Sequence, residues 1–156
     1  MTELSATTSE VIDRWIHADP DPRTLIHIET LRSDSKSFDR AFGQPLKFGT
    51  AGLRGKMGPG PGSMNRLVMR VAAKAIANQL IADDLTQKGI VIGYDARIES
   101  DLYALDAARI FQSMSIECLL VEGPIPTPVL ARLVTGRGFG AGLLVTASQN
   151  PRADNG

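Results

Sequence analysis

The chain has 156 residues, 43% of them hydrophobic and 22% charged, proportions that are typical of one soluble globular domain and do not favour a disordered or fibrous class. Seventeen Lys and Arg balance seventeen Asp and Glu without a run of one sign, so the basic surface expected of a nucleic-acid-binding protein is missing. No apolar run approaches the ~18 residues that span a bilayer, and the N-terminus lacks a signal-peptide pattern, so we expect a cytoplasmic protein without membrane or nucleic-acid partners.

The first residues of the chain are expected to be helical. Apolar residues at helical spacing, from Val11 to Ile16 and from Leu25 to Leu31, predict two short helices between about residues 8 and 42. The prolines of Asp19–Pro22 separate them, because proline disfavours helix at the residue before it, and the two helices should pack as a hairpin. Residues 1–45 are therefore assigned to an N-terminal helical extension and residues 46–156 to the main domain.

A glycine-rich stretch opens the main domain. Residues 49–62 contain six glycines, too many for a regular helix or strand, so a long structured loop is predicted. Asn65 can then cap a helix that runs to about Lys88. Its predicted apolar face consists of Val68, Val71, Ala72, Ala75, Ile76 and Leu80.

The remaining elements alternate between strand and helix. Strands are predicted over residues 90–94, 116–121 and 140–145, with helices between them, the last over residues 127–134. The first of these helices is expected to be capped by Ser100 and to have an apolar face of Leu102, Leu105, Ala108 and Phe111. This alternation predicts the α/β class, as a three-layer α/β/α domain with a mixed or mainly parallel sheet of about four strands and an N-terminal helical extension.

The polar turn after the last predicted strand carries the main functional signal. Open α/β sheets form their sites at the carboxyl ends of strands, where Ser148 is placed. The residues alone leave two interpretations open, a serine that caps or closes a turn and a nucleophile. His17 and His27 lie in the N-terminal helices, so a Ser-His-Asp triad is disfavoured. A serine that carries a phosphoryl group needs positioning and cations instead, which Arg54 in the glycine loop can supply.

Two more polar residues end a strand at the same predicted edge. Asp95 and Arg97 follow the strand over residues 90–94 directly. The favoured interpretation is structural, with the two side chains paired to each other.

Four motifs in order resemble the first domain of the phosphoglucomutase/phosphomannomutase (α-D-phosphohexomutase) family. They are FGTAGLRG at residues 48–55, GYDAR at 93–97, PTP at 126–128 and TASQNP at 146–151, within a resemblance that covers about residues 46–156. The resemblance implies that Ser148 is a phosphoserine that exchanges its phosphoryl group with a hexose or pentose phosphate. It also implies that Arg54, Thr50 and Asn150 bind substrate and that Mg²⁺ binds through the phosphate on Ser148.

Two departures from the family pattern accompany the resemblance. Gln149 stands where members usually have histidine, and glutamine hydrogen-bonds a phosphate but cannot carry a proton. The family's lysine, aspartate-rich metal loop, sugar-recognition loop and phosphate-binding domain would all follow Gly156. We therefore expect a truncated domain that is inactive alone. The alternatives are a non-catalytic phosphate-binding or interaction module, a decayed gene fragment, and an enzyme completed by a partner that supplies the missing mutase domains.

Overall fold

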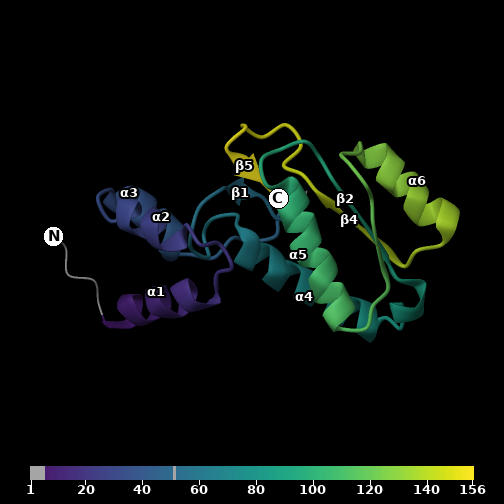
Figure 1. Cartoon of the computed structure of the whole chain (residues 1–156), viewed down its shortest axis with the longest axis horizontal. Coiled ribbons are helices and arrows are strands. Elements are labelled where there is room, and N and C mark those ends of the chain that lie inside the picture. The colour runs from purple at the N-terminus through teal and green to yellow at the C-terminus, as the bar shows by residue number, and fades with distance from the viewer. Residues whose placement is uncertain (1–5, 51) are drawn as a thin grey trace.

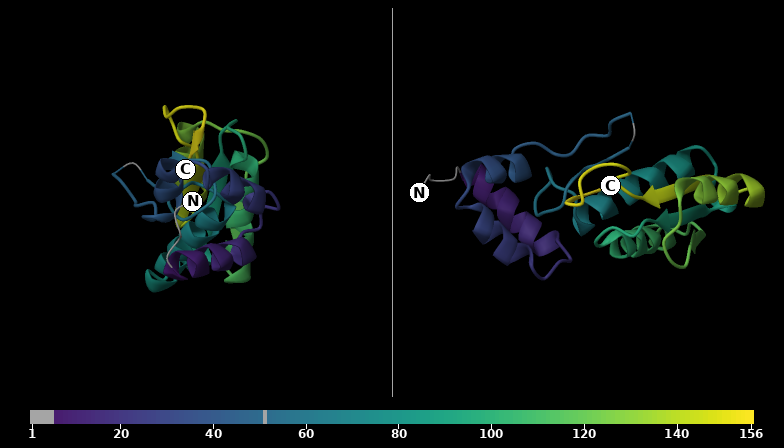
Figure 2. Two further views of the ribbon diagram at one scale, coloured as in Figure 1. Left: turned by 90° about the vertical axis from the view of Figure 1, so that its left-hand side faces the viewer. Right: turned by 90° about the horizontal axis from the view of Figure 1, so that it is seen from above.

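A computed structural model describes residues 6–50 and 52–156. Three helices, α1 (Ala6–Ala18), α2 (Thr24–Leu31) and α3 (Ser35–Phe42), lie at one end of the elongated molecule (Figures 1 and 2). They enclose a small core of their own, which contains Ile12, Ile28 and Phe38.

We predicted a hairpin of two N-terminal helices, but the structure has three helices in this region. The chain turns after α2 because the Asp34 carboxylate accepts hydrogen bonds from the backbone N–H groups of Lys36 and Ser37 and so caps α3. Phe42 at the end of α3 then packs edge-on against Trp15 of α1, with ring centroids 6.4 Å apart.

The main sheet has three parallel strands in the order β3-β2-β4. The strands are β2 (Ile90–Tyr94), β3 (Cys118–Leu120) and β4 (Ala141–Val145). Helix α5 (Ser100–Ser113) joins β2 to β3, and α6 (Thr127–Arg137) joins β3 to β4. Helices α4 (Arg66–Ala82) and α5 lie on one side of the strands and α6 on the other (Figure 1), which confirms the α/β/α fold class.

Two further strands form a separate antiparallel pair. They are β1 (Gly55–Lys56), inside the glycine-rich stretch, and β5 (Asp154–Asn155), at the end of the chain. A short 3-10 helix, Thr86–Lys88, precedes β2.

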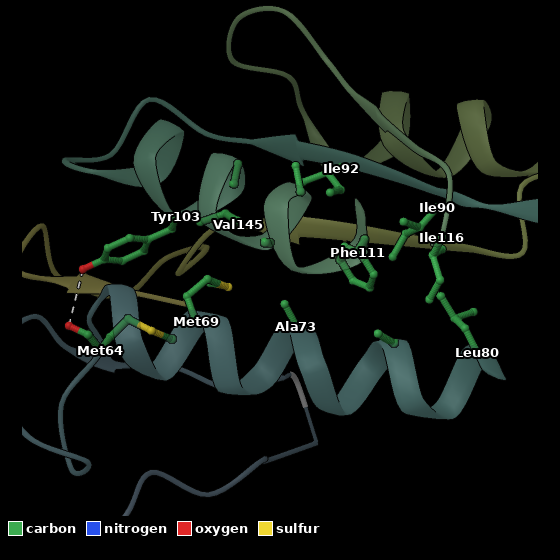
Figure 3. Packing of buried hydrophobic residues seen from close by; sticks show 14 residues of the cluster. Met64, Met69, Ala73, Leu80, Ile90, Ile92, Tyr103, Phe111, Ile116 and Val145 are labelled. Atoms are coloured by element: carbon green, nitrogen blue, oxygen red, sulfur yellow. Dashed lines mark hydrogen bonds between the residues drawn. The ribbon is translucent and has the colours of Figure 1, made fainter. Parts of the chain in front are cut away.

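The core of the domain lies between α4, α5 and the sheet (Figure 3). Tyr103 and Phe111 of α5 are fully buried there, together with Ile90 and Ile92 of β2. The buried Tyr103 hydroxyl has a hydrogen-bond partner, because it donates to the Met64 carbonyl over 3.4 Å, as Figure 3 shows.

The predicted α4 is wrong in its length, and its predicted apolar face is wrong in part, at Val71 and Ala75. The helix ends at Ala82 rather than near Lys88, because Asp84 adopts a left-handed conformation with φ 55°. Val71 is 64% exposed and Ala75 is exposed. The buried residues are Met69, Ala72, Ala73, Ala77 and Leu80. Ala72 and Leu80 of the predicted face are thus buried, and Val68 and Ile76 are partly buried against the core, where α4 packs on α5.

The predicted face and cap of α5 are also wrong in part. Leu102 and Leu105 are partly exposed, whereas Tyr103 and its neighbours on the adjacent face are buried, because α5 contacts both the sheet and α4. The N-cap position belongs to Glu99, and Ser100 lies within the helix with its hydroxyl donating to Asp95 over 2.8 Å.

The junction between the N-terminal helices and the domain depends on Gly62. Its N–H donates to the Ala41 carbonyl over 2.8 Å, and a Cβ added to Gly62 would lie 2.7 Å from the Gln44 carbonyl oxygen. We expect Gly62→Ala to lower the free energy of unfolding of the N-terminal helices by about 1–3 kcal/mol, because the backbone at residue 62 must move away from the backbone at Gln44. Urea unfolding followed by fluorescence of Trp15, the single tryptophan, measures this. Gly136→Ala in α6, where an added Cβ meets nothing within 4 Å, is the control, and an equal effect there would contradict the prediction.

Candidate functional site

The candidate site lies where the connections of the sheet diverge. From β2 the chain goes to β3 on one side and then to β4 on the other, through helices on opposite faces. The carboxyl ends of β2 and β4 are therefore neighbours at a switch point, the usual place for a ligand in an open α/β sheet. The Asp95 N–H donates to the Val145 carbonyl over 3.0 Å, so the loop after β2 starts beside the loop after β4.

Asp95 joins the two loops through its side chain. Its carboxylate accepts hydrogen bonds from the Thr146 hydroxyl at 2.6 Å, the Ser100 hydroxyl at 2.8 Å and the Arg97 backbone N–H at 3.0 Å. Burial acts to raise the pKa of this carboxyl, but these hydrogen bonds and the Arg97 charge outweigh it and hold the pKa of Asp95 below its usual value. Asp95 is therefore an anion at neutral pH that anchors the start of the serine loop, residues 146–156.

Ser148 is presented at the surface of the serine loop in an unusual backbone conformation. It is exposed, and its φ is 55°, in the left-handed region that few non-glycine residues adopt. The Thr146 hydroxyl accepts a hydrogen bond from the Ser148 N–H over 2.9 Å and supports this conformation. From Ser148 to Gly156 the described chain forms turns and the strand β5 but no helix, so the Ser148 hydroxyl does not serve as a helix cap. Strained, exposed residues of this kind gather at functional sites.

The glycine loop reaches the serine loop through the small antiparallel sheet. Gly55 pairs with Asn155 and Lys56 with Asp154, which places Arg54 next to the end of the serine loop. A Cβ added to Gly156 would lie 2.8 Å from the Cγ of Arg54. Arg54 is half-buried, and its guanidinium makes no hydrogen bond or ion pair with any described residue. This guanidinium is therefore available for an anion.

The glycine loop is held in shape by Asn65. Its side-chain oxygen accepts from the Val68 N–H over 2.9 Å, which confirms the predicted cap of α4. Its side-chain nitrogen donates to the carbonyls of Gly58 and Gly60, both at 2.9 Å. Asn65 thus fixes the second half of the glycine loop, after the segment that contains Arg54.

The other predicted site residues differ in their exposure and in their hydrogen bonds. Gln149 is exposed directly beside Ser148. The Asn150 side-chain nitrogen donates to Asp154 over 2.9 Å, so part of its hydrogen-bonding capacity serves the loop itself. Thr50 lies in an exposed turn closed by hydrogen bonds between Gly49 and Gly52, and its neighbour Ala51 lies outside the described residues.

Sequence reasoning missed the full role of Arg97. Its ion pair with Asp95, at 3.2 Å, agrees with the favoured interpretation. Its guanidinium also donates to four backbone carbonyls of the serine loop, which no motif spacing indicates. The buried side chain of Asn155 also connects the serine loop to the start of α5, because it donates hydrogen bonds to the Ile98 carbonyl and the Ser100 hydroxyl at 3.0 Å each.

The described residues do not make up a complete metal site. Within residues 6–50 and 52–156 no three His, Cys, Asp or Glu side chains lie close enough to hold an ion. Both oxygens of Asp95, the carboxylate anchoring the serine loop, already accept hydrogen bonds. Mg²⁺ prefers oxygen ligands that include carboxylates, which one phosphorylated serine does not provide.

A cavity of about 450 Å³ lies between the N-terminal helices and the glycine loop. It is lined by α2, by residues 56–59 and by Tyr103, and by none of the predicted site residues. Arg23, just before α2, and Glu99, just before α5, form a salt bridge in the lining of this cavity. In the part of the chain that is described, no helix is long and apolar enough to cross a membrane.

Comparison with known proteins connects this geometry to one family. Residues 45–156 match the family profile described as phosphoglucomutase/phosphomannomutase, alpha/beta/alpha domain I. The chain is 37% identical to a phosphopentomutase of Pongo abelii over 92% of this chain and 25% of that protein. It is 39% identical to a phosphoglucomutase of Staphylococcus haemolyticus over 76% of this chain and 21% of that protein.

Structural comparison gives the same result. The crystal structure of a Thermus thermophilus protein assigned as a phosphomannomutase superposes with a TM-score of 0.63 and 28% identity. The superposition covers 72% of this chain and 24% of that one. The chain thus spans about a quarter of the length of the relatives that it matches.

Proposed function

The chain belongs to the phosphoglucomutase/phosphomannomutase family, and we propose that as its domain I it carries the phosphoryl group on Ser148 during transfer within a sugar phosphate. The observation that supports this most is the exposed Ser148 in left-handed backbone at the switch point of the sheet. The Arg54 guanidinium beside the same loop matches the oxygens of a phosphate. Residues 46–156 form the phosphoryl-carrying domain and residues 1–45 an extension of it.

The transfer is a substitution at phosphorus. A hydroxyl oxygen of the sugar forms the new P–O bond while the bond from phosphorus to Ser148 Oγ breaks, and the hydroxyl proton must go to a base. The reverse step at the other phosphate of the bisphosphate restores phosphoserine, so the net reaction moves one phosphate between two hydroxyls. Arg54 offsets charge on the transferring group. Gln149 can donate a hydrogen bond to it but cannot accept the proton.

The names of the relatives support a proposal for the substrate class. Their names identify phosphopentomutases and phosphoglucomutases, so we propose a pentose or hexose phosphate as substrate. Since the chain spans about a quarter of such proteins, we propose that turnover requires the remaining domains, with further ligands for Mg²⁺. A phosphate-binding module without catalysis is the second candidate, supported by the available Arg54.

Phosphoryl uptake by Ser148 tests the proposal. The chain is incubated with a hexose 1,6-bisphosphate and with the Staphylococcus haemolyticus phosphoglucomutase lacking its own first domain. Tryptic digestion isolates residues 138–152, in which Thr146 and Ser148 are the two hydroxyl-bearing residues. We expect one phosphoryl group on Ser148 and mutase turnover by the mixture. Binding of the sugar phosphate without either result supports the module, and absence of binding contradicts both candidates.

Gln149 limits the rate in this proposal. We expect Gln149→His to raise mutase turnover of the mixture by about 10- to 100-fold, because histidine can pass a proton at neutral pH. The pH dependence of turnover should gain a titration near the usual pKa of histidine, about 6.5. Gln149→Asn, which keeps an amide, is the matched control, and equal rates for the two variants would contradict a role in proton transfer.

A further inference from the structure

Arg97 binds the serine loop at four points. Its Nη2 donates to the Ser148 carbonyl at 2.7 Å and to the Asn150 carbonyl at 2.9 Å. Its Nη1 donates to the Pro151 carbonyl at 2.9 Å and to the Asp154 carbonyl at 3.1 Å. The remaining nitrogen, Nε, faces Asp95 at 3.2 Å. The half-buried Arg97 side chain thus donates hydrogen bonds to backbone carbonyls on both sides of the turn that follows Ser148.

These contacts oppose two unfavourable features of the loop. Four carbonyl dipoles point toward one place, which is repulsive unless a cation lies there. Ser148 also adopts a left-handed backbone conformation, which is unfavourable for a non-glycine residue. Because the Ser148 carbonyl is itself one of the acceptors, the guanidinium fixes the peptide that follows the serine. Hydrogen bonds to a charged donor are stronger than neutral ones, so together they can hold this conformation.

We propose that Arg97 is the positioning residue that holds Ser148 exposed and ready to accept a phosphoryl group, a role that rests on the proposed function. Arg97 acts through the backbone of the serine loop, with its hydrogen-bonding capacity used there, whereas Arg54 stays available for phosphate. Asp95 orients Arg97 and holds Thr146, so the loop after β2 sets the shape of the loop after β4. A lysine cannot replace the planar, forked guanidinium in this position.

Hydrogen exchange of the serine loop tests the proposal directly. The amides of Ser148, Asn150 and Asp154 are hydrogen-bonded within the loop, to Thr146, Ala147 and Pro151. In Arg97→Ala we expect these amides to exchange about tenfold faster or more, while the amides of α4 keep their rates. Guanidinium chloride at millimolar concentration should restore slow exchange, relative to equal sodium chloride, and Arg97→Lys should not.

Arg152→Ala is the matched control. Arg152 lines the same surface hollow as Asp95 and Arg97, but its side chain forms no hydrogen bond or ion pair with a described residue. Its removal should leave exchange of the loop unchanged. Unchanged exchange in Arg97→Ala, or an equal rise in α4, would overturn the positioning role. A wild-type chain that takes up no phosphate while its loop responds as expected would contradict the proposed function alone.

Discussion

Replacing Ser148 with alanine is expected to reduce phosphoryl uptake and mutase turnover of the mixture by about a thousandfold or more. The reason is that the Ser148 Oγ is the atom that forms and breaks the bond to phosphorus in the proposed transfer. The serine loop should keep its conformation, because the hydrogen bonds that hold it involve Arg97, Asp95 and backbone groups rather than the Ser148 hydroxyl. Mass spectrometry of residues 138–152 and a coupled assay of sugar phosphate isomerisation measure the two losses.

Ser115 offers a matched control for this substitution. It is also an exposed serine in left-handed backbone, with φ 58°, but it precedes β3 at the opposite edge of the sheet from Ser148. Ser115→Ala therefore reproduces any effect on folding without touching the candidate site, and should leave uptake unchanged. Phosphate that moves to Thr146 in Ser148→Ala, or turnover that persists there, would contradict the assignment of the carrier.

The sheet and the location of the site could be predicted because local patterns determine them. Short β-branched runs such as Ile90–Tyr94 are buried on both faces, and their alternation with helices implies parallel strands whose carboxyl ends meet. Ser148 and Asp95 both follow such strands, so their shared edge was predictable from order alone.

The details that depend on distant partners could not be predicted. Strand β1 is two residues long and forms only because β5, about a hundred residues later, pairs with it. The four carbonyl contacts of Arg97 depend on how the serine loop folds back, which side-chain patterns do not encode. The buried face of α5 was misread for a related reason, since a charged residue, Asp106, is buried there against partners on α4.

The ion cluster around Asp106 is expected to be the most costly polar contact to break. Asp106 of α5 is fully buried and accepts from Arg66 at 2.6 Å and from Arg70 at 2.7 Å, both on α4. Asparagine cannot offset the charge of two partly buried guanidinium groups. We expect Asp106→Asn to lower the free energy of unfolding by about 3–5 kcal/mol, measured by urea denaturation at pH 7. Asp101→Asn, exposed in the first turn of α5, should cost less than about 1 kcal/mol.

The pH dependence of stability distinguishes this charge effect from a change in packing. Burial acts to raise the pKa of Asp106, but hydrogen bonds from Arg66 and Arg70 outweigh it and hold the pKa below the usual value. A carboxyl whose pKa is lower in the folded state stabilises the protein fully above the unfolded pKa of about 4, and this stabilisation is lost as the pH falls through the folded pKa. The gap in unfolding free energy between wild type and Asp106→Asn should therefore narrow as the pH falls below about 4. A gap that is independent of pH would indicate lost packing and contradict the electrostatic cause.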